Sequence, residues 1–419
     1  LMRSSAASDV YKRQRVLTTR LTWILLSVAI LCSIFMAYIP VTFESVTYTG
    51  ERGQEVRLKG VDAVKYLQEI RADLEGDVTP EKVKTALAAF QECLNKYGVT
   101  DTYELPEEAD TKGLLPYWDY VHGIREAFAD EETGIAPALT EINPKDTEQY
   151  YEKVSRRTEA LLKMEQTDSV SAQKKATAMY DEVEKPFQYY SGISSNSMDY
   201  QILLIYIITI LCVVIAAPVF TSDYQTGADD ILRCTKHGRR RMAVCKILSA
   251  LLICGGAFLL CSVVWILITN ALFGWESTKT SIQFIFSVSS LPNLTIGEAQ
   301  WVNLAASFVM FLAIVSFALY LSTKMRSTVS ALAVALLFCI LPMLATNVFP
   351  GELGLWLQSI LPGGGIGMGN SFLYALIDFK FLNLGNLAVW TPYALVFFAV
   401  IQIPVFLGMA VYSHCRMRQ

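Results

Sequence analysis

The sequence predicts an all-α polytopic membrane protein with six transmembrane helices and a mainly helical extracellular domain between the first two. Three observations lead to this fold class. The 419 residues are 53% hydrophobic and have a mean hydropathy of +0.36, which is more apolar than an ordinary soluble protein. Six uncharged apolar segments approach or exceed the length that a bilayer requires. The charged residues are also divided unevenly along the chain.

That division separates one polar domain from the apolar segments. Residues 41–200 contain 31 acidic and 18 basic residues, a net charge of −13, whereas the rest contains 8 acidic and 17 basic residues, a net charge of +9. A nucleic-acid partner would require a basic face, so the strongly acidic domain excludes nucleic-acid binding. The basic residues instead gather at the ends of apolar segments.

The first transmembrane helix is expected within residues 15–40. Its uncharged stretch, Leu21–Ile39, has 19 residues, and at ~1.5 Å per residue it nearly crosses a hydrocarbon core about 30 Å thick. A cleaved signal peptide is the alternative, but Met36–Pro40 does not form a small-residue cleavage site, which favours a retained anchor. Residues 1–14 (LMRSSAASDVYKRQ) resemble a translated sequencing adapter and are expected to be an artefact.

Residues 41–200 are predicted to form the extracellular helical domain. The clearest helix begins at the N-cap Thr79, with Pro80 at its first position, and stops at Gly98. Its apolar stripe consists of Val83, Leu87, Phe90, Leu94 and Tyr97.

Three further apolar stripes predict helices in the same domain, and one alternating stretch predicts a hairpin. The helices are expected near residues 61–74, 151–162 and 179–190, the last bent at Pro186. The alternating pattern in residues 41–58 predicts a short β-hairpin.

Residues 201–419 are predicted to form the transmembrane domain. Its five helices are expected at about 201–220, 247–273, 301–322, 327–348 and 387–411. Residues 349–386 are apolar but interrupted by Gly and Pro. We expect them to form two half-helices that dip into the outer half of the membrane, where surrounding protein satisfies the broken backbone.

The short basic segments determine the predicted orientation. They all fall on one side of the six spans, which places them and both termini in the cytoplasm of a bacterial cell with the protein in its plasma membrane. The residues expected to act as topology anchors are Arg239, Arg240, Arg241, Lys246, Lys324 and Arg326.

The predicted spans contain no recognisable catalytic chemistry. The only glycine-rich run, Leu361–Asn370, lacks the lysine of a P-loop, and none of the six apolar segments contains a charged residue. Only Cys93 of the nine cysteines lies in the polar domain, and the three histidines are far apart in the sequence, so no metal site is expected. The chain is therefore predicted not to be an enzyme and to bind no cofactor, so energy for transport would come from another protein.

The loop 221–246 is the most informative cytoplasmic segment. Ser222 and Gln225 have capping-box spacing, which predicts a short helix from about Ser222 to Cys234 with Asp223 near its positive end. Ordinary topology anchoring is the alternative explanation for the basic run Arg239–Arg241 that follows.

This loop, FTSDYQTGADDILRCTKHGRRRMAVCK, resembles the loop between the second and third spans of ABC-2 type exporter permeases. The resemblance rests on an acidic residue, a glycine, a short helix and an Arg-then-Lys entry into the next span. The matching positions are Asp223, Gly227, Ile231, Leu232, Arg239–Arg241 and Lys246.

The resemblance implies a coupling helix that sits in a groove of a separate ATPase subunit, which binds the ATP. It also implies a homodimer or heterodimer with a second permease, and a subgroup with a large domain after the first span. The residues expected to dock onto the ATPase are Asp223, Gly227, Asp229, Asp230, Ile231, Leu232 and Arg233.

Two other functions remain open from the sequence. A membrane-anchored extracellular protein could use the acidic domain to bind or sense a peptide or a cation. An ion-coupled secondary transporter would instead depend on an ion gradient, although it usually carries charged residues at membrane depth.

Overall fold

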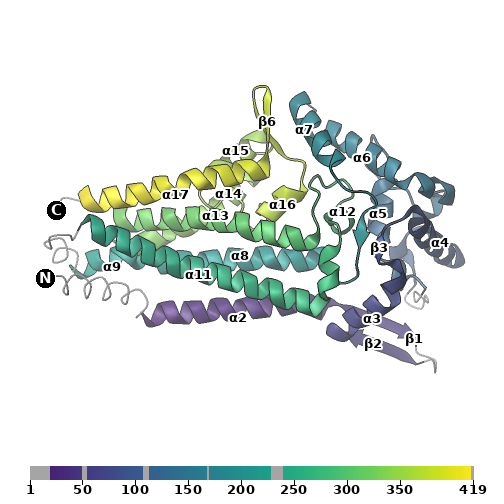
Figure 1. Ribbon diagram of the computed structural model, residues 1–419, viewed down its shortest axis with the longest axis horizontal. Helices are drawn as coiled ribbons and strands as arrows, with labels where there is room; N and C mark the ends of the chain where they lie inside the picture. Colours follow the sequence, from purple (N-terminus) through teal and green to yellow (C-terminus); the bar gives the residue numbers. More distant parts are fainter. Residues whose placement is uncertain (1–18, 50–53, 107–112, 168, 228–238, 417–419) are drawn as a thin grey trace.

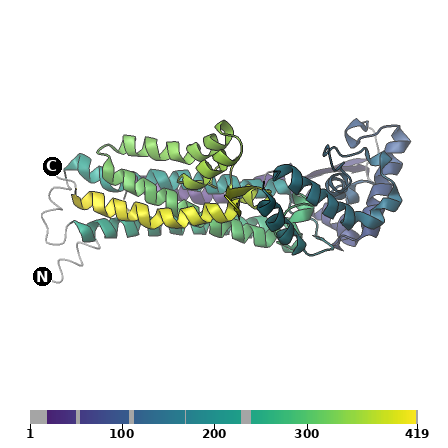
Figure 2. The ribbon, with the colours of Figure 1, turned by 90° about the horizontal axis from the view of Figure 1, so that it is seen from above.

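The computed structural model describes residues 19–49, 54–106, 113–167, 169–227 and 239–416. Long helices form a bundle at one end of an elongated molecule, and a smaller domain, here called the head, lies beyond the other end (Figure 1). Figure 2 shows the same arrangement from a perpendicular direction. The head comprises the described residues from Ser45 to Ser194.

Six helices of the described chain are long and apolar enough to span a membrane, which confirms the predicted number. They are α2 (Arg20–Phe43), α8 (Ser195–Ala216) with its continuation α9 (Pro218–Thr226), α11 (Arg240–Phe273), α13 (Ile296–Lys324), α14 (Thr328–Val348) and α17 (Thr391–Arg416). Helices α2, α8, α11 and α13 begin before the predicted uncharged segments, because helical hydrogen bonding continues into flanking residues that the bilayer does not require to be apolar.

Helix α13 lies at the centre of the bundle. It packs against α8, α11, α14 and α17, and its apolar region is more buried than that of any other span. Its first turn is fixed by a capping box between Thr295 and Glu298. The outer helices α2, α14 and α17 expose large apolar side chains such as Leu31 and Phe397. Such faces are disfavoured in water and typical of contact with lipid.

Buried amide side chains join three helices near the head. Asn270 and Gln300 exchange two hydrogen bonds, of 2.9 and 3.0 Å, between α11 and α13. Gln201 on α8 donates to the main-chain oxygen of Gln300 at 3.0 Å and accepts from Asn303 at 3.1 Å. These amides satisfy one another in an apolar interior, where an unsatisfied polar group costs free energy.

The head is mainly helical. Its principal elements are the antiparallel hairpin β1 (Ser45–Thr49) and β2 (Glu55–Lys59), the helices α3 (Val61–Arg71), α4 (Pro80–Tyr97), α5 (Tyr120–Ala127), α6 (Tyr150–Glu165) and α7 (Val170–Asp181), and the short strands β3 (Gly76–Asp77) and β4 (Gln188–Tyr189). The predicted helix after Thr79 is confirmed. Thr79 accepts from the Lys82 amide at 3.4 Å, and Gly98 ends α4 with a φ of 69°.

The predicted helix near residues 179–190 is wrong. Helix α7 ends at Asp181, and the chain then runs to strand β4, which pairs with β3. Val183 and Phe187 are buried as their apolar pattern suggested, but they reach the core from irregular backbone. The Phe187 amide donates to the Tyr151 hydroxyl at 2.9 Å, a tertiary contact that replaces the helical hydrogen bond.

The segments that connect the spans at the head end are also structured. The connection between α11 and α13 contains η6 (Trp275–Lys279) and α12 (Ile282–Ile285), and the connection between α14 and α17 contains α15 (Glu352–Ile360), α16 (Phe372–Ile377), β5 (Phe381–Leu384) and β6 (Leu387–Trp390). Two short helices therefore lie in the stretch where half-helices were predicted. The β5–β6 hairpin was not predicted, and it delays the start of the last long helix to Thr391.

Candidate functional site

The predicted coupling segment connects α9 to α11 at the bundle end where α2 begins and α17 ends, here called the basic end (Figure 1). Five of the residues predicted to dock onto an ATPase lie outside the described residues, and so does the part of the predicted helix that would carry them, residues 228–234. They are Asp229, Asp230, Ile231, Leu232 and Arg233. The structure describes the two sides of the segment, up to Gly227 and from Arg239 onward.

The predicted start of a new helix at Ser222 is wrong. Ser222 lies inside α9, which begins at Pro218 and ends at Thr226. Proline is tolerated in the first turn of a helix because the missing amide has no helical partner there, so Pro218 allows the helix to continue past α8. Gly227, with a φ of 69°, then ends α9. Gly227 therefore acts as a stop before the coupling segment.

Asp223 and Lys246 form a buried ion pair between α9 and α11. Asp223 is 3% exposed, and the Lys246 side chain is 10% exposed. The Lys246 ammonium also donates to the Val219 carbonyl at 3.2 Å and lies 4.9 Å from the centre of the Phe220 ring. Both residues were expected in the loop, as a docking residue and a topology anchor. The structure instead places them inside helices, facing each other.

Further polar contacts attach α9 to the rest of the bundle. The Tyr224 hydroxyl lies 3.1 Å from Nδ1 of His414, a fully buried residue of α17. Ser322 of α13 donates to the Ala217 carbonyl at 2.7 Å and accepts from the Phe220 amide at 3.0 Å. The short α9 therefore contacts α11, α13 and α17 through specific hydrogen bonds or charges.

The other predicted topology anchors lie on the surface of the basic end. Arg239, Arg240 and Arg241 are exposed at the start of α11, and Lys324 and Arg326 are exposed between α13 and α14. Positive charges at a helix N-terminus oppose the helix dipole, by roughly 0.3–1 kcal/mol each. The helix dipole therefore does not explain the arginines at the start of α11.

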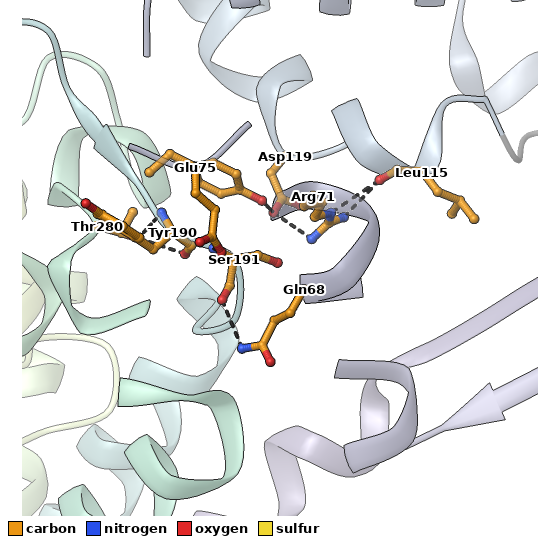
Figure 3. Close-up of polar contacts among 9 residues, drawn as sticks. Gln68, Arg71, Glu75, Leu115, Asp119, Tyr190, Ser191 and Thr280 are labelled. Atoms are coloured by element: carbon orange, nitrogen blue, oxygen red, sulfur yellow. Dashed lines mark hydrogen bonds and ion pairs between the residues drawn. The ribbon is translucent and has the colours of Figure 1, made fainter. Parts of the chain in front are cut away.

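A second site lies in the head, beside the end of α11 that is opposite the basic end and beside the segment that leads into α8 (Figure 3). The side-chain amide of Gln68, on α3, donates to the Phe273 carbonyl at 2.7 Å and to the Ser191 carbonyl at 3.2 Å. Phe273 is the last residue of α11, and Ser191 lies just before α8. One side chain of the head thus binds the end of α11 and the chain segment that leads into α8.

Charged and aromatic groups hold α3, the helix that carries Gln68, within the head. Arg71 pairs with Asp119 at 2.8 Å and donates to the Leu115 carbonyl, while the Tyr189 hydroxyl donates to Asp119 at 2.7 Å (Figure 3). Glu44, at the end of α2, lies within the electrostatic reach of these groups. Burial raises its pKa above the usual value and Asp119 raises it further, whereas Arg71 lowers it.

Gly192 allows the chain to pass closely beside α11 at this junction. Its φ is +146°, which side chains rarely adopt, and a Cβ at this position would lie 2.3 Å from the Phe273 carbonyl oxygen. No pattern in the sequence indicated a role for Gln68. Gly192 was the only residue whose type could have indicated a close approach of the chain at this junction, because a single glutamine on a helix belongs to no recognisable motif.

The fold and these sites define the protein as a multi-pass helical membrane protein. The sequence model of a family described as protein of unknown function (DUF2705) matches residues 169–412, more than half of the chain, and the chain belongs to this family. The match runs from the end of the head through five of the six spans. No curated protein matches the sequence. Among the described residues, no group of histidine, cysteine and carboxylate side chains could hold a metal ion.

Replacing Lys246 with methionine should destabilise the protein by about 3–5 kcal/mol, because it leaves the buried carboxylate of Asp223 without its cation. The double variant Asp223→Asn/Lys246→Met removes both charges and should recover most of that loss. Denaturant unfolding in detergent micelles measures the free energy of unfolding of the single and the double variant. Lys279→Met is the control, since it breaks an exposed ion pair that contributes little to stability. Equal losses in the single and double variants would show that charge pairing is not what holds α9 to α11.

Gly192→Ala should destabilise the protein by roughly 2–3 kcal/mol through backbone strain and contact with the Phe273 carbonyl. The apparent melting temperature in micelles should fall accordingly. Gly113→Ala is the matched control, because a Cβ there meets no atom within 4 Å and its φ is not positive. Similar melting temperatures for the two variants would contradict a close approach at Gly192.

Glu44→Gln should raise the apparent melting temperature at pH 7.5. The raised pKa means that the folded state binds the proton more tightly than the unfolded state, so stability falls as pH rises through the folded-state pKa. Glutamine cannot ionise, so the variant does not lose stability in this way. The difference in melting temperature between the variant and the unaltered protein should shrink as the pH is lowered toward 5. Glu141→Gln, at an exposed position, is the control. A difference in melting temperature that is constant from pH 5 to 7.5 would contradict a raised pKa of Glu44.

Proposed function

We propose that this protein is the permease subunit of an ATP-driven exporter of the ABC-2 type, coupling ATP hydrolysis by a separate ATPase subunit to movement of a substrate across the bacterial plasma membrane. The observation that carries the proposal is that the two helices leading to the coupling segment are tied together at both ends. Asp223 and Lys246 join α9 to α11 at the basic end, and at the other end Gln68 binds the last residue of α11 and Ser191, in the segment that leads into α8.

This arrangement supports movement of the two helices as a rigid lever. A force applied to the segment between Gly227 and Arg239 would act on α8, α9 and α11 together, because the buried ion pair resists their separation. The contacts of Tyr224 with His414 and of Ser322 with α9 would pass the movement to α17 and α13. The head would move with the far ends of α8 and α11. Such a rigid-body step is a common form of switching.

The proposed partners follow from the same lever mechanism. The ATPase subunit would bind ATP and contact the basic end, which lies in the cytoplasm, while the head lies outside the cell. A second permease, either identical or different, would complete the membrane part. This chain itself would bind no ATP and would act as the transport subunit rather than as an enzyme. The exposed arginines at the start of α11 suit the cytoplasmic side of a membrane protein.

The double variant Ile231→Asp/Leu232→Asp tests the proposed docking segment. Two carboxylates in an apolar contact should reduce the amount of ATPase recovered by at least tenfold, since loss of one central contact residue commonly costs about 2 kcal/mol. The tagged full chain would be purified from native host membranes, and P-loop ATPases recovered with it would be quantified by mass spectrometry.

Ile135→Asp is the matched control, because Ile135 is a strongly exposed apolar residue of the head. It should leave recovery of the ATPase unchanged. Undiminished recovery with the double variant would contradict the docking segment, and absence of any ATPase with the unaltered chain would contradict the exporter proposal as a whole.

A further inference from the structure

A groove of about 810 Å³ lies at the head end of the bundle, between helices α13 and α17. Its walls come from the N-terminal half of α13, the first two turns of α17 and helix α16, and the end of α7 and the loop before α13 line it toward the head. Figure 1 shows these elements where the bundle meets the head. The volume falls within the roughly 300–1,000 Å³ that is typical of small-molecule sites.

The groove is polar at the head and apolar within the bundle. Glu182 and Asn293 line its end at the head, and both are exposed. Trp301 and Tyr393, on α13 and α17 near this end, are exposed aromatic residues of the type that gathers at the level of lipid headgroups. Further into the bundle the lining is apolar and includes Val302, Ala305, Val309, Val396 and Phe397. The groove therefore runs from headgroup level into the hydrocarbon region.

The apolar part of the groove is continuous with the lipid-facing surface of α17. Phe397 lines the groove and is 60% exposed. Val400 and Ile401, one turn further along α17, are exposed as well. Ala305 and Ala306 leave space on the α13 side that larger side chains would fill. An acyl chain of the surrounding bilayer can therefore enter the groove sideways, without leaving an apolar environment.

Two residues of opposite charge lie on the side of α7 that faces the groove. Lys175 and Glu182 are seven residues apart, which places them on one helix face at a separation of about 10 Å along the axis. The Lys175 ammonium lies 5.8 Å from the centre of the Tyr393 ring, which lines the groove, and donates to the Ala388 carbonyl at 3.3 Å. An ammonium has three donors, so two remain for a ligand.

The polar groups at the end of the groove are open to a ligand. Within the part of the chain that the structure describes, the Glu182 carboxylate has no hydrogen-bond or ion-pair partner. The side-chain oxygen of Asn293 accepts from a backbone amide at 3.4 Å, which leaves its amino group to donate. A cation, an anion acceptor and an apolar chain therefore all find complementary groups along one groove.

We propose that the groove holds one zwitterionic phospholipid from the leaflet on the side of the head. One acyl chain lies between α13 and α17, the phosphate meets the Lys175 ammonium and the Asn293 amino group, and the ammonium of the lipid meets Glu182. Bilayer chains are as apolar as the groove, so the acyl chain gives no preference among lipids and the headgroup decides. An anionic lipid lacks the ammonium and is opposed by Glu182. The inference rests on the membrane fold and does not depend on the proposed exporter function.

Native mass spectrometry of the full chain released from detergent micelles tests the headgroup preference. The probes are palmitoyl-oleoyl phosphatidylethanolamine (POPE) and palmitoyl-oleoyl phosphatidylglycerol (POPG), which have the same acyl chains. The first POPE should bind about fivefold more tightly than the first POPG, because exposed ion pairs contribute modestly. Equal affinity for the two lipids, or tighter binding of POPG, overturns the proposal.

A steric variant locates the lipid in the groove. Ala305→Trp fills the apolar part and should weaken binding of the first POPE about fivefold, since the acyl chain loses its space. Ala333→Trp is the matched control, because Ala333 is an exposed alanine of α14 outside the groove. POPE affinity that is unchanged in Ala305→Trp, or lowered equally in both variants, shows ordinary lipid contact and overturns the assignment to this groove.

A charge variant decides the matter if Ala305→Trp fails to fold. Lys175→Gln/Glu182→Gln should make the affinities for POPE and POPG equal, because it removes both headgroup contacts. Lys84→Gln/Glu148→Gln removes an exposed ion pair elsewhere in the head and should preserve the preference for POPE. A preference for POPE that survives Lys175→Gln/Glu182→Gln overturns the assignment of the headgroup to these residues.

Discussion

The buried ion pair between Asp223 and Lys246 is the constraint on which the basic end of the bundle depends. Removing two charges from water costs free energy, and the pair tolerates burial only while the charges remain in contact. Helices α9 and α11 therefore cannot separate or slide past each other without breaking this buried ion pair. The contacts of Tyr224 and Ser322 extend this constraint to α17 and α13.

At the other end, the head completes the hydrogen bonding of the bundle. The last carbonyl groups of a helix have no partner within the helix, and Gln68 supplies one for Phe273 at the end of α11. The same amide binds Ser191 before α8, and Gly192 permits the close approach. Buried apolar residues of the head and of the spans also form one continuous core. The head is thus mechanically joined to the helices rather than tethered to them by a flexible linker.

Between these two ends, the polar side chains that link the described spans are chiefly neutral amides. Asn270 and Gln300 bind each other, and Gln201 joins them to α8. Such a network fixes the relative positions of three helices without placing a charge at the centre of the bundle. The buried ion pair of Asp223 and Lys246 lies beyond this network, at the basic end.

The sequence by itself determined the number of spans and the mainly helical head. Bilayer thickness imposes a long uncharged run on each span, and local signals such as Thr79 and Gly98 set the ends of α4. Only the tertiary structure decided that Asp223 and Lys246 face each other, that Gln68 binds the end of α11 and the segment before α8, and that the chain leaves α7 at Asp181. These features depend on partners far away in the sequence, whose positions no local pattern specifies. Asp223 and Lys246 were predicted to lie in a loop because they are charged. Hydropathy measures composition alone and cannot show that two charged residues of different helices neutralise each other.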